Sequence, residues 1–441
     1  MKNYFYRLLR NYLSLYILPS SSVVEINPQS VQLIGQMPSG KVSFINPPRS
    51  SAEAFPQDQI LAFDAIKKFN PEYIFLGGII HEERDIQKLF NQVHKLCESD
   101  TRLILTYYSN LWSPLVKLAS LIKIRRKTPI SNWLAHEDID NLLRLENFEI
   151  IRVDHKILCP IYIPLISNFL NRYLAPLPIF KNFCLVNIAI ARPIFPLNYH
   201  LEPSVSIIVP ARNEAGNIED LINRVPQMGP QDELIFIEGN STDNTWEIIE
   251  HVYEKYTPTK KIIIAKQPGK GKGDAVRTGF NLANNEILMI LDADMTVPPE
   301  DLPKFYKAIV EGKGEFINGT RLVYPMEKKA MRFFNLIGNK FFAMSFSYVL
   351  GQRFKDTLCG TKVISKKSYQ LLSSNRSYFG EFDPFGDFDL IFGAARMGLK
   401  IVEVPISYRE RTYGETNISR WRHGAILFSM LLFASHKFLF I

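Results

Sequence analysis

Short apolar segments alternate with amphipathic segments along the second half of the chain. Five runs rich in β-branched residues predict strands, at 205–209, 233–237, 261–265, 287–291 and 315–317. Helical patterns begin between them, near Asn217, Thr242, Gly273 and Glu300. Strand–helix alternation at this spacing predicts βαβ units and a mainly parallel sheet. Because ligands of such sheets bind beyond the carboxyl ends of the strands, the residues just after each strand are candidates for function.

The first half of the chain shows the same alternation. Strands are expected at 23–26, 41–45, 72–76, 102–106 and 149–153, with helices from Gln57, Glu83 and His136. Residues 1–22 mix apolar and basic positions and predict an amphipathic first helix, since Arg7 and Arg10 interrupt any signal-peptide core. The fold class is therefore α/β with two domains, at 1–192 and 204–424. Three prolines and Asn198 predict a linker at 193–203.

Composition narrows the class of protein. A length of 441 residues suits two or three domains, and 46% hydrophobic with 22% charged residues excludes a disordered chain or a disulfide scaffold. Four widely spaced cysteines predict reduced thiols in a cytosolic protein. The net charge of +8 and the 31 Phe and 19 Tyr favour an anionic partner surface. Nucleic acid is disfavoured, because the basic residues accompany carboxylates at strand ends and do not line one face.

Polar clusters follow the first four predicted strands of the second half. The clusters lie at 210–214, 238–243, 268–277 and 292–294. Asp292 and Asp294, two residues apart on an extended segment, can share one Mg²⁺ or Mn²⁺ with phosphate oxygens. The glycine-rich loop offers backbone N–H groups and Lys270 or Lys272 for anionic oxygens. Together with carboxylates that can accept from a base edge or ribose, these clusters predict a nucleoside-diphosphate ligand.

These residues resemble the family 2 glycosyltransferases of the GT-A fold, and within them the dolichyl- or polyprenyl-phosphate sugar synthases. The resemblance covers residues 204–424. It is carried by the segments Pro210-Ala211-Arg212-Asn213-Glu214, Asp292-Ala293-Asp294 (the DxD motif), Gly319-Thr320-Arg321, Asp356-Thr357-Leu358-Cys359-Gly360-Thr361-Lys362 and Arg411-Thr412-Tyr413-Gly414-Glu415-Thr416.

The resemblance implies a role for each matched residue. Asp294 would hold the metal and act in catalysis, Asp292 would bind metal or ribose, and Glu214 and Glu238 would bind the nucleoside. The remaining donor-binding positions are Pro210, Ala211, Arg212, Ser241, Lys272, Gly273 and Arg321. The family often carries two Asp after the second strand, where this chain has Glu238-Gly239, which leaves the choice between uracil and guanine open.

The acceptor side has two readings. Arg321, Arg332, Lys362 and Arg411 match the family's acceptor-phosphate cations, and a phosphate acceptor needs no strong base. Asp387 or Asp389 instead could serve a hydroxyl acceptor as a catalytic base, or could pair with Arg409 or Arg411. In that second account the arginines form a structural network with Asp356, Asp387 and Asp389.

The predicted function is metal-dependent, inverting transfer of a sugar from a nucleotide donor to a polyprenyl phosphate, by an enzyme held peripherally at the cytoplasmic, inner face of the membrane. The segment 332–352 resembles the family's interfacial helices, with a buried core helix as the alternative, and 425–441 is expected at the interface because it is too short to span a bilayer. Transfer to a glycan or lipid hydroxyl, and a non-catalytic nucleotide or lipid-surface binding module, are the alternatives.

The N-terminal half resembles a class I SAM-dependent methyltransferase with a Rossmann-like sheet. The family's glycine-rich loop after the first strand is replaced by Asn27-Pro28-Gln29-Ser30-Val31, and its ribose-binding acid by Asn46. Only glycine lets the backbone approach such a cofactor closely, so a degenerate domain that binds no SAM and serves docking or scaffolding is expected.

Overall fold

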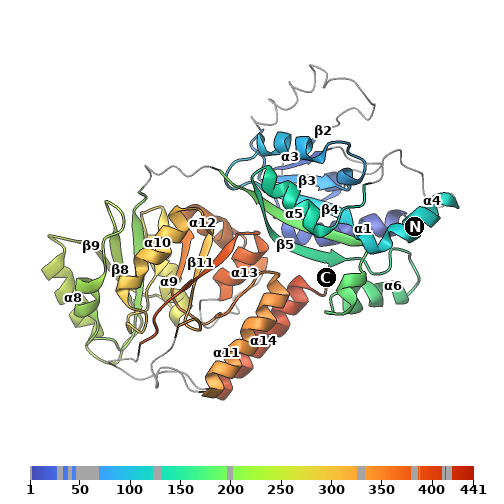
Figure 1. Ribbon diagram of the computed structural model, residues 1–441. Coiled ribbons are helices and arrows are strands. Elements are labelled where there is room, and N and C mark those ends of the chain that lie inside the picture. Colours follow the sequence, from blue (N-terminus) through green and yellow to red (C-terminus); the bar gives the residue numbers. More distant parts are fainter. Residues whose placement is uncertain are drawn as a thin grey trace. The chain divides into compact units, whose positions relative to one another are not determined.

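A computed structural model describes residues 2–26, 33–37, 42–45, 69–122, 132–195, 202–324, 333–378, 386, 388–409, 413 and 420–441. The chain forms two compact units. Unit 1 contains Met1–Pro196 together with Ser435–Ile441, and unit 2 contains Leu197–Ala434. Both are mixed α/β, which confirms the α/β class predicted from the sequence (Figure 1).

Unit 1 is built on a six-stranded sheet of order β2-β1-β3-β4-β6-β5. Its strands are β1 (Val23–Ile26), β2 (Val42–Ile45), β3 (Tyr73–Gly77), β4 (Arg102–Tyr108), β5 (Phe148–Lys156) and β6 (Val186–Pro193). The first four are parallel, whereas β6 runs antiparallel to both β4 and β5. Five of these strands were predicted from the sequence, and β6 was missed.

The helices of unit 1 are α1 (Lys2–Tyr16), α3 (Ile86–His94), α4 (Ser113–Leu121), α5 (His136–Leu145) and α6 (Ile166–Phe169). The predicted first helix is confirmed, because α1 buries an apolar face that includes Leu9, Tyr12, Leu13 and Tyr16. The helix expected from Gln57, the loop at 27–31 and Asn46 lie outside the described residues.

The last residues of the chain belong to the core of unit 1. Phe438 is fully buried, and the Arg152 guanidinium lies 5.7 Å from the centroid of its ring and 5.4 Å from that of Tyr16. Phe438 therefore packs inside unit 1, and the interfacial position predicted for 425–441 stays a prediction.

Unit 2 contains a seven-stranded sheet of order β13-β11-β12-β10-β7-β8-β9. The strands are β7 (Val205–Ala211), β8 (Glu233–Glu238), β9 (Lys261–Lys266), β10 (Ile287–Ile290), β11 (Phe316–Thr320), β12 (Lys362–Ser365) and β13 (Ile401–Pro405). β7 to β10 form a parallel block, and β12 is antiparallel to β10 and β11. The five predicted strands are present, and β12 and β13 were missed.

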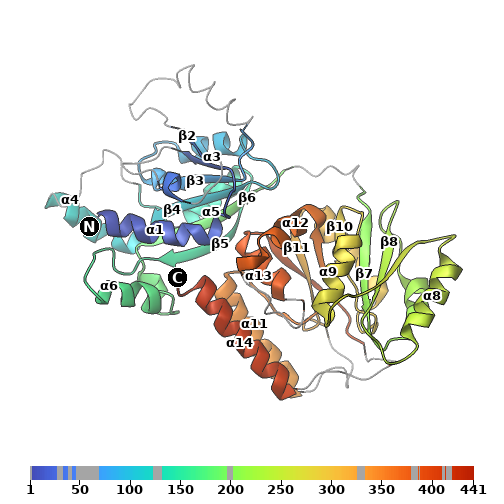
Figure 2. The same cartoon turned by 180° about the vertical axis from the view of Figure 1, so that it is seen from behind.

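The helices of unit 2 cover this sheet and form a projecting pair (Figures 1 and 2). They are α7 (Ile218–Arg224), α8 (Thr245–Tyr256), α9 (Lys272–Leu282), α10 (Leu302–Val310), α11 (Phe333–Leu350), α12 (Lys366–Ser374), α13 (Phe388–Arg396) and α14 (Arg420–Phe438). α11 and α14 lie side by side in both views. None of the described helices combines the length and the apolarity that a membrane span requires.

α11 combines the two alternatives that its sequence left open. Phe346 is buried and its ring centroid lies 5.0 Å from that of Phe388 on α13, whereas Ile337, Phe341 and Met344 are exposed. One face of the helix therefore packs in the core of unit 2, and the other presents apolar side chains to the surroundings.

Candidate active site

The polar clusters of unit 2 converge where the strand order reverses. From β7 the chain proceeds to β8 and β9 on one side, and then places β10 on the other side of β7. Such a switch point leaves a crevice outside the carboxyl ends of the two strands, where open α/β sheets bind ligands. Arg212 follows β7 and the Asp292/Asp294 pair follows β10, so both stand at the edge of the sheet where such a crevice is expected.

Two buried glutamates brace the loops after β7 and β8. The Glu214 N–H donates to Thr245 Oγ1 at 3.0 Å, and its carboxylate accepts from Asn217 Nδ2 at 2.7 Å. Glu238 accepts the backbone N–H of Ser241, whose Oγ in turn accepts the N–H of Asn213 at 3.0 Å. These contacts cross-link the two loops, so Pro210, Ala211 and Arg212 are held in a defined path beside Glu214 and Glu238.

The glycine-rich loop leads directly into α9. The Gly269 N–H donates to Asp274 at 2.7 Å, and Gly271 has a φ of 85°, a left-handed value that favours glycine. A Cβ on Gly273 would lie 2.9 Å from the Cα of Gly386, so these two glycines permit close approach of the backbones. The loop therefore presents the N-terminus of an eleven-residue helix, a position that favours anionic groups.

Lys272 and Asp292 form the central ion pair of the site. Lys272 Nζ lies 2.6 Å from Asp292 Oδ1, and the Asp292 side chain is 26% exposed. Burial would raise the pKa of Asp292, but attraction to Lys272, with contributions from Lys362 and Arg321, outweighs it and lowers the pKa below its ordinary value. Asp292 is thus ionised and partly exposed at this edge of the sheet.

Asp294 is oriented by its own turn. Its Oδ1 accepts the Thr296 N–H at 3.1 Å and the Thr296 hydroxyl at 2.9 Å. Both hydrogen bonds end on the same oxygen, so the turn fixes the Asp294 carboxylate through Oδ1 and these two contacts do not involve Oδ2.

Gly360 keeps the space around this pair open. A Cβ on Gly360 would overlap Asp292 Oδ2 and lie 2.6 Å from Lys272 Nζ. Gly360 precedes β12, and because β12 is antiparallel to β10, its start lies at the same sheet edge as the end of β10. We expect Gly360→Ala to lower kcat/KM by about 100-fold, because displacing a catalytic group by about 1 Å has an effect of that size.

The fold should survive this substitution, since the overlapping atoms are the ends of side chains that can move. Gly338→Ala on α11 is the matched control, because no atom lies within 4 Å of the added methyl group. Steady-state kinetics and thermal melts of both variants test this prediction. It fails if Gly360→Ala retains wild-type kcat/KM, or if its activity falls only in proportion to a loss of folded protein.

Arg321 is held by a fully buried carboxylate. Its Nε and Nη2 donate to the two oxygens of Asp356 at 2.6 and 2.8 Å, and its backbone N–H donates to Oδ2 at 3.1 Å. Asn339 Nδ2 and the Leu358 N–H add further hydrogen bonds to Asp356, and the guanidinium lies 5.1 Å from the Tyr408 ring centroid. This Arg321–Asp356 pair agrees with the structural network that the sequence offered as its second account of the arginines.

Sequence reasoning missed one acidic residue beneath the site. Glu403 on β13 accepts the backbone N–H groups of Lys355 and Asp356 at 2.8–3.0 Å, and burial raises its pKa. It thereby fixes the segment that carries Asp356. Sequence analysis missed Glu403 because it did not predict β13, and a single glutamate in a segment without assigned structure forms no recognisable motif.

The acceptor side is only partly described. Asp387, Arg332 and Arg411 lie outside the described residues. Asp389 forms a 2.7 Å ion pair with Arg376, a partner that the sequence did not suggest. Lys362 is buried and donates to the backbone carbonyl of Cys359.

Tyr413, from the Arg411–Thr416 segment, reaches the first loop of the site. A Cβ on Gly216 would lie 2.6 Å from its ring, so the ring packs against this glycine. In the part of the chain that the structure describes, three or more His, Cys, Asp or Glu side chains are nowhere grouped as a metal site. The Asp292/Asp294 pair alone offers two carboxylates, and a hard cation there would take its other oxygens from a ligand or water.

The sequence matches known proteins through this unit. Residues 206–370 match the family described as "Glycosyl transferase family 2". The chain is 30% identical over 227 residues to glycosyltransferase AglJ of Haloferax volcanii. The alignment covers 51% of this chain and 70% of that protein. The chain is also 30% identical over 220 residues to dolichol-phosphate mannosyltransferase of Pyrococcus furiosus, covering 48% of this chain and 59% of that protein.

Among solved structures, glucosyl-3-phosphoglycerate synthase from Mycobacterium tuberculosis, in complex with Mn²⁺, UDP and glucosyl-3-phosphoglycerate, aligns with a TM-score of 0.39 and 17% identity. The alignment covers 54% of this chain and 80% of that one.

Proposed function

Since this chain belongs to glycosyltransferase family 2, we propose that it transfers a sugar from a nucleoside-diphosphate donor to a polyprenyl phosphate. The acceptor class is taken from relatives such as the dolichol-phosphate mannosyltransferase. In this reaction an anionic oxygen of the acceptor phosphate attacks the anomeric carbon of the sugar. The bond to the nucleoside diphosphate breaks as the new bond forms, so the configuration at that carbon inverts.

One observation carries the proposal. Asp292, Lys272 and Gly360 come from three segments that are far apart in sequence, and they meet within hydrogen-bond or van der Waals distance beside the switch point of the sheet. If the DxD motif had arisen by chance in a surface loop, Asp292 would not be expected to pair with Lys272 at the start of α9. Nor would a glycine, Gly360, be expected at the one place where a Cβ would overlap the Asp292 carboxylate. The arrangement suits a diphosphate, whose charge needs cations and N–H donors.

The carboxylate pair fits a divalent cation. Asp292 is ionised and partly exposed, and Asp294 is oriented by Thr296, so both can supply the oxygen ligands that Mg²⁺ and Mn²⁺ prefer. A cation held there would neutralise the developing charge on the departing diphosphate. Lys272 at the start of α9 would bind the same phosphates, and Glu214 and Glu238 the nucleoside.

A phosphate acceptor is favoured over a hydroxyl acceptor by the state of the late acidic residues. A hydroxyl must lose a proton to a base, whereas a phosphate is already an anion. Asp389 is engaged by Arg376, and Arg321 supplies a charged guanidinium at the end of β11. Arg321, with Arg411 and Arg332 from the sequence resemblance, would bind the acceptor phosphate, and Asp387 remains the candidate base for the alternative.

A polyprenyl acceptor places the reaction at a membrane, and we propose its inner face. The exposed side chains of Ile337, Phe341 and Met344 on α11, and of Phe428 and Leu432 on α14, could contact the isoprenoid chain or the bilayer interface.

We further propose that unit 1 is a methyltransferase-like domain that binds no SAM. A pocket beside the ends of β1, β3 and β4 is lined by Phe5, Tyr6 and Leu9 of α1 together with Glu25, Gly77 and Gly78. The proposal rests on the sequence, in which residues 27–31 contain no glycine and include Pro28. Glu25 at the end of β1 is buried, and its carboxylate accepts the N–H groups of Leu33 and Ile34.

The test is a donor screen that measures nucleotide release by the full chain. UDP- and GDP-sugars are supplied with Mg²⁺ or Mn²⁺, with and without polyprenyl phosphate, and each reaction is repeated with a chelator. We expect one donor to release nucleotide rapidly only when metal and polyprenyl phosphate are both present, with a matching glycolipid product. A free polyprenyl alcohol is the matched acceptor control. Release that depends on a hydroxyl acceptor would refute the acceptor assignment, and equal rates in the chelator would refute the metal.

A further inference from the structure

A large apolar surface on unit 1 has no role in the sugar-transfer site. It consists of residues 111–122, which include α4, and residues 161–183, which include α6, and is called the unit 1 apolar surface below. Of the twenty-eight exposed large hydrophobic side chains among the described residues, fifteen lie in these two segments. Contiguous exposed apolar areas of this kind mark interaction sites, whereas isolated exposed side chains do not.

α4 contributes an apolar stripe with no core face behind it. None of its residues is buried. Leu111, Leu115, Leu118 and Ile122 recur at helical spacing and are all exposed, and Leu121 beside them is 78% exposed. A surface helix of a soluble protein normally turns such a stripe towards the core. Here the stripe faces outward, so packing within unit 1 does not explain it.

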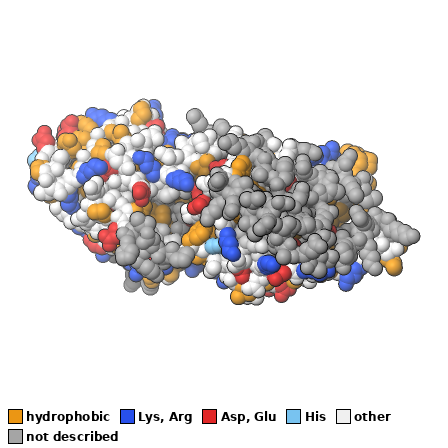
Figure 3. All heavy atoms as spheres, turned by 90° about the horizontal axis from the view of Figure 1, so that it is seen from above, with side chains coloured by type: hydrophobic (Ala, Val, Ile, Leu, Met, Phe, Trp, Pro, Cys, Tyr) orange, Lys and Arg blue, Asp and Glu red, His pale blue; other side chains and the backbone are white. Residues whose placement is uncertain are grey.

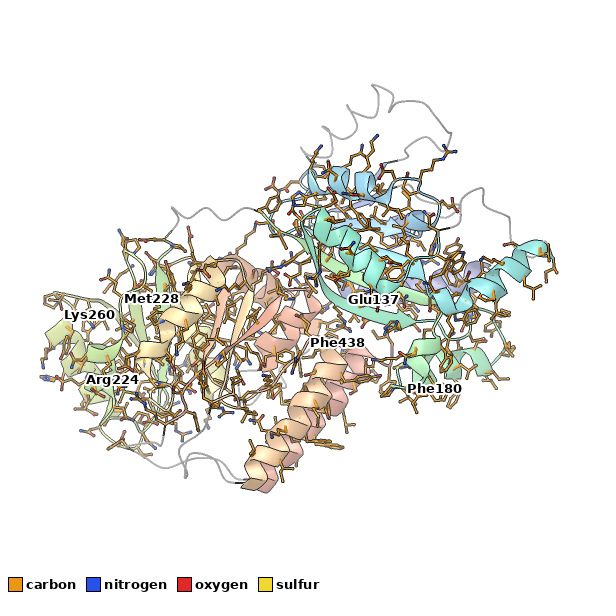
Figure 4. All side chains as sticks on the ribbon, viewed as in Figure 1. Glu137, Phe180, Arg224, Met228, Lys260 and Phe438 are labelled. Carbon is orange, nitrogen blue, oxygen red and sulfur yellow. The ribbon has the colours of Figure 1, made fainter. Side chains whose placement is uncertain are left out.

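The second segment is apolar to a similar degree. Leu165 is 86% exposed and Ile179 is 72% exposed. The other exposed large side chains are Ile161, Tyr162, Ile163, Ile166, Phe169, Tyr173, Leu177 and Phe183. Phe180, labelled in Figure 4, belongs to the same segment beyond α6.

The two segments adjoin each other. Trp112 Nε1 donates to the Phe183 carbonyl at 2.8 Å, and the Ser109 N–H donates to the Leu185 carbonyl at 2.9 Å. α4 and α6 lie at the same end of unit 1 in both ribbon views (Figures 1 and 2). The exposed side chains therefore belong to one region of the surface.

The side-chain charges of this region favour a negatively charged partner. The described residues of this region, 109–122, 132–134 and 157–186, contain no Asp or Glu, although the chain as a whole has 44. These described residues include three basic ones, Lys117, Arg172 and Lys181. On the face of the molecule seen from above, by contrast, acidic and basic side chains are interspersed (Figure 3).

We propose that the unit 1 apolar surface docks onto an anionic lipid bilayer. Apolar side chains on a short helix, accompanied by Lys, Arg, Trp and Tyr and by no acidic residue, are the features of segments that lie in the membrane interface. Anionic headgroups attract each basic residue near the surface. A second copy of the same surface is disfavoured, because two acid-free basic regions repel each other.

This inference does not rest on the proposed function. The surface belongs to unit 1, and it would bind anionic lipid whatever acceptor the site in unit 2 uses. Failure of the donor screen and failure of lipid binding are therefore separate results.

Vesicle co-sedimentation of the full chain tests the proposal. We expect binding to vesicles of phosphatidylcholine with about one third phosphatidylglycerol, and binding at least about tenfold weaker to pure phosphatidylcholine or at high salt. The double variant Leu118→Glu/Leu121→Glu should weaken binding at least about tenfold, since it places two charges in the apolar stripe. α4 has no buried residue, so this variant should fold, which a thermal melt checks.

Two control variants locate the effect. Leu282→Glu/Leu371→Glu changes exposed leucines of unit 2 in the same way and should bind vesicles like the wild type. Leu145→Glu changes an exposed leucine of unit 1 outside this surface and should also bind vesicles like the wild type. The proposal is overturned if Leu118→Glu/Leu121→Glu binds anionic vesicles like the wild type, or if Leu145→Glu weakens the binding as strongly as the α4 variant does. It is also overturned if the protein ignores anionic vesicles, or if the surface instead mediates self-association that the α4 variant abolishes.

Discussion

Asp294→Asn is expected to reduce sugar transfer by at least about a thousandfold while the fold stays intact. Loss of a charged ligand from the leaving-group site removes several kcal/mol of transition-state stabilisation, and about 1.4 kcal/mol corresponds to a factor of ten. Asparagine keeps an oxygen that can accept the N–H and hydroxyl of Thr296, so the turn at the end of β10 is preserved. Only the charge is lost.

The matched control is Asp220→Asn on α7, the same chemical change at a carboxylate that pairs with Arg224 on the surface. Its kinetics and melting temperature should match the wild type, because exposed ion pairs of this kind contribute little. Turnover by Asp294→Asn that approaches the wild-type rate at saturating Mg²⁺ or Mn²⁺ would refute the role of this residue.

The sequence predicted β1 to β5 and β7 to β11 because these strands are short, mostly apolar runs that alternate with helical patterns. It missed β6, β12 and β13. These strands take their places in the sheets by pairing with strands that are distant in the sequence. β12 is only four residues long and begins with a lysine, so neither its length nor its pattern indicates a strand. Its place in the sheet is set by β10 and β11, which a local pattern does not reveal.

The same limit applies to the site. Asp292 and Asp294 were predicted because a short motif after a strand needs no knowledge of tertiary structure. The contact of Gly360 with Asp292 depends on the antiparallel direction of β12, and Glu403 depends on β13. The pairing of Arg321 with Asp356 was one of two accounts, since charged residues far apart in sequence do not indicate which carboxylate meets which cation.

The second large effect concerns this buried pair. Arg321→Ala is expected to destabilise unit 2 by about 3–5 kcal/mol, the usual result of leaving one partner of a buried ion pair without the other. Asp356 is 0% exposed and would keep the hydrogen bonds from Asn339 and the Leu358 N–H, but it would lose the guanidinium that balances its charge. Chemical denaturation monitored by circular dichroism measures the change.

The pH dependence of this loss follows from the pKa of Asp356. Burial would raise that pKa, but Arg321 and the surrounding donors lower it to about 2. In the wild type, the contribution of the Arg321–Asp356 pair to the free energy of unfolding is therefore fully present above the pKa of an unfolded Asp, about 3.9. It is lost as the pH falls through the folded pKa of about 2. Without Arg321, burial prevails and the folded pKa rises above the unfolded value. The variant then loses stability as pH rises through that raised pKa, so its deficit should be larger at about pH 8 than at about pH 5.

A second substitution separates the two roles considered for Arg321. Arg321→Met/Asp356→Leu removes both charges and should recover most of the lost stability, since apolar side chains can replace a buried ion pair. If Arg321 also binds the acceptor phosphate, this stable double variant should still show a strongly raised KM for polyprenyl phosphate, while hydrolysis of the donor by water persists. If the arginine is only structural, the double variant should recover transfer together with stability. We expect the first result, because Arg321 stands at the end of β11 with its guanidinium fixed by Asp356, and a pre-oriented planar cation suits a phosphate.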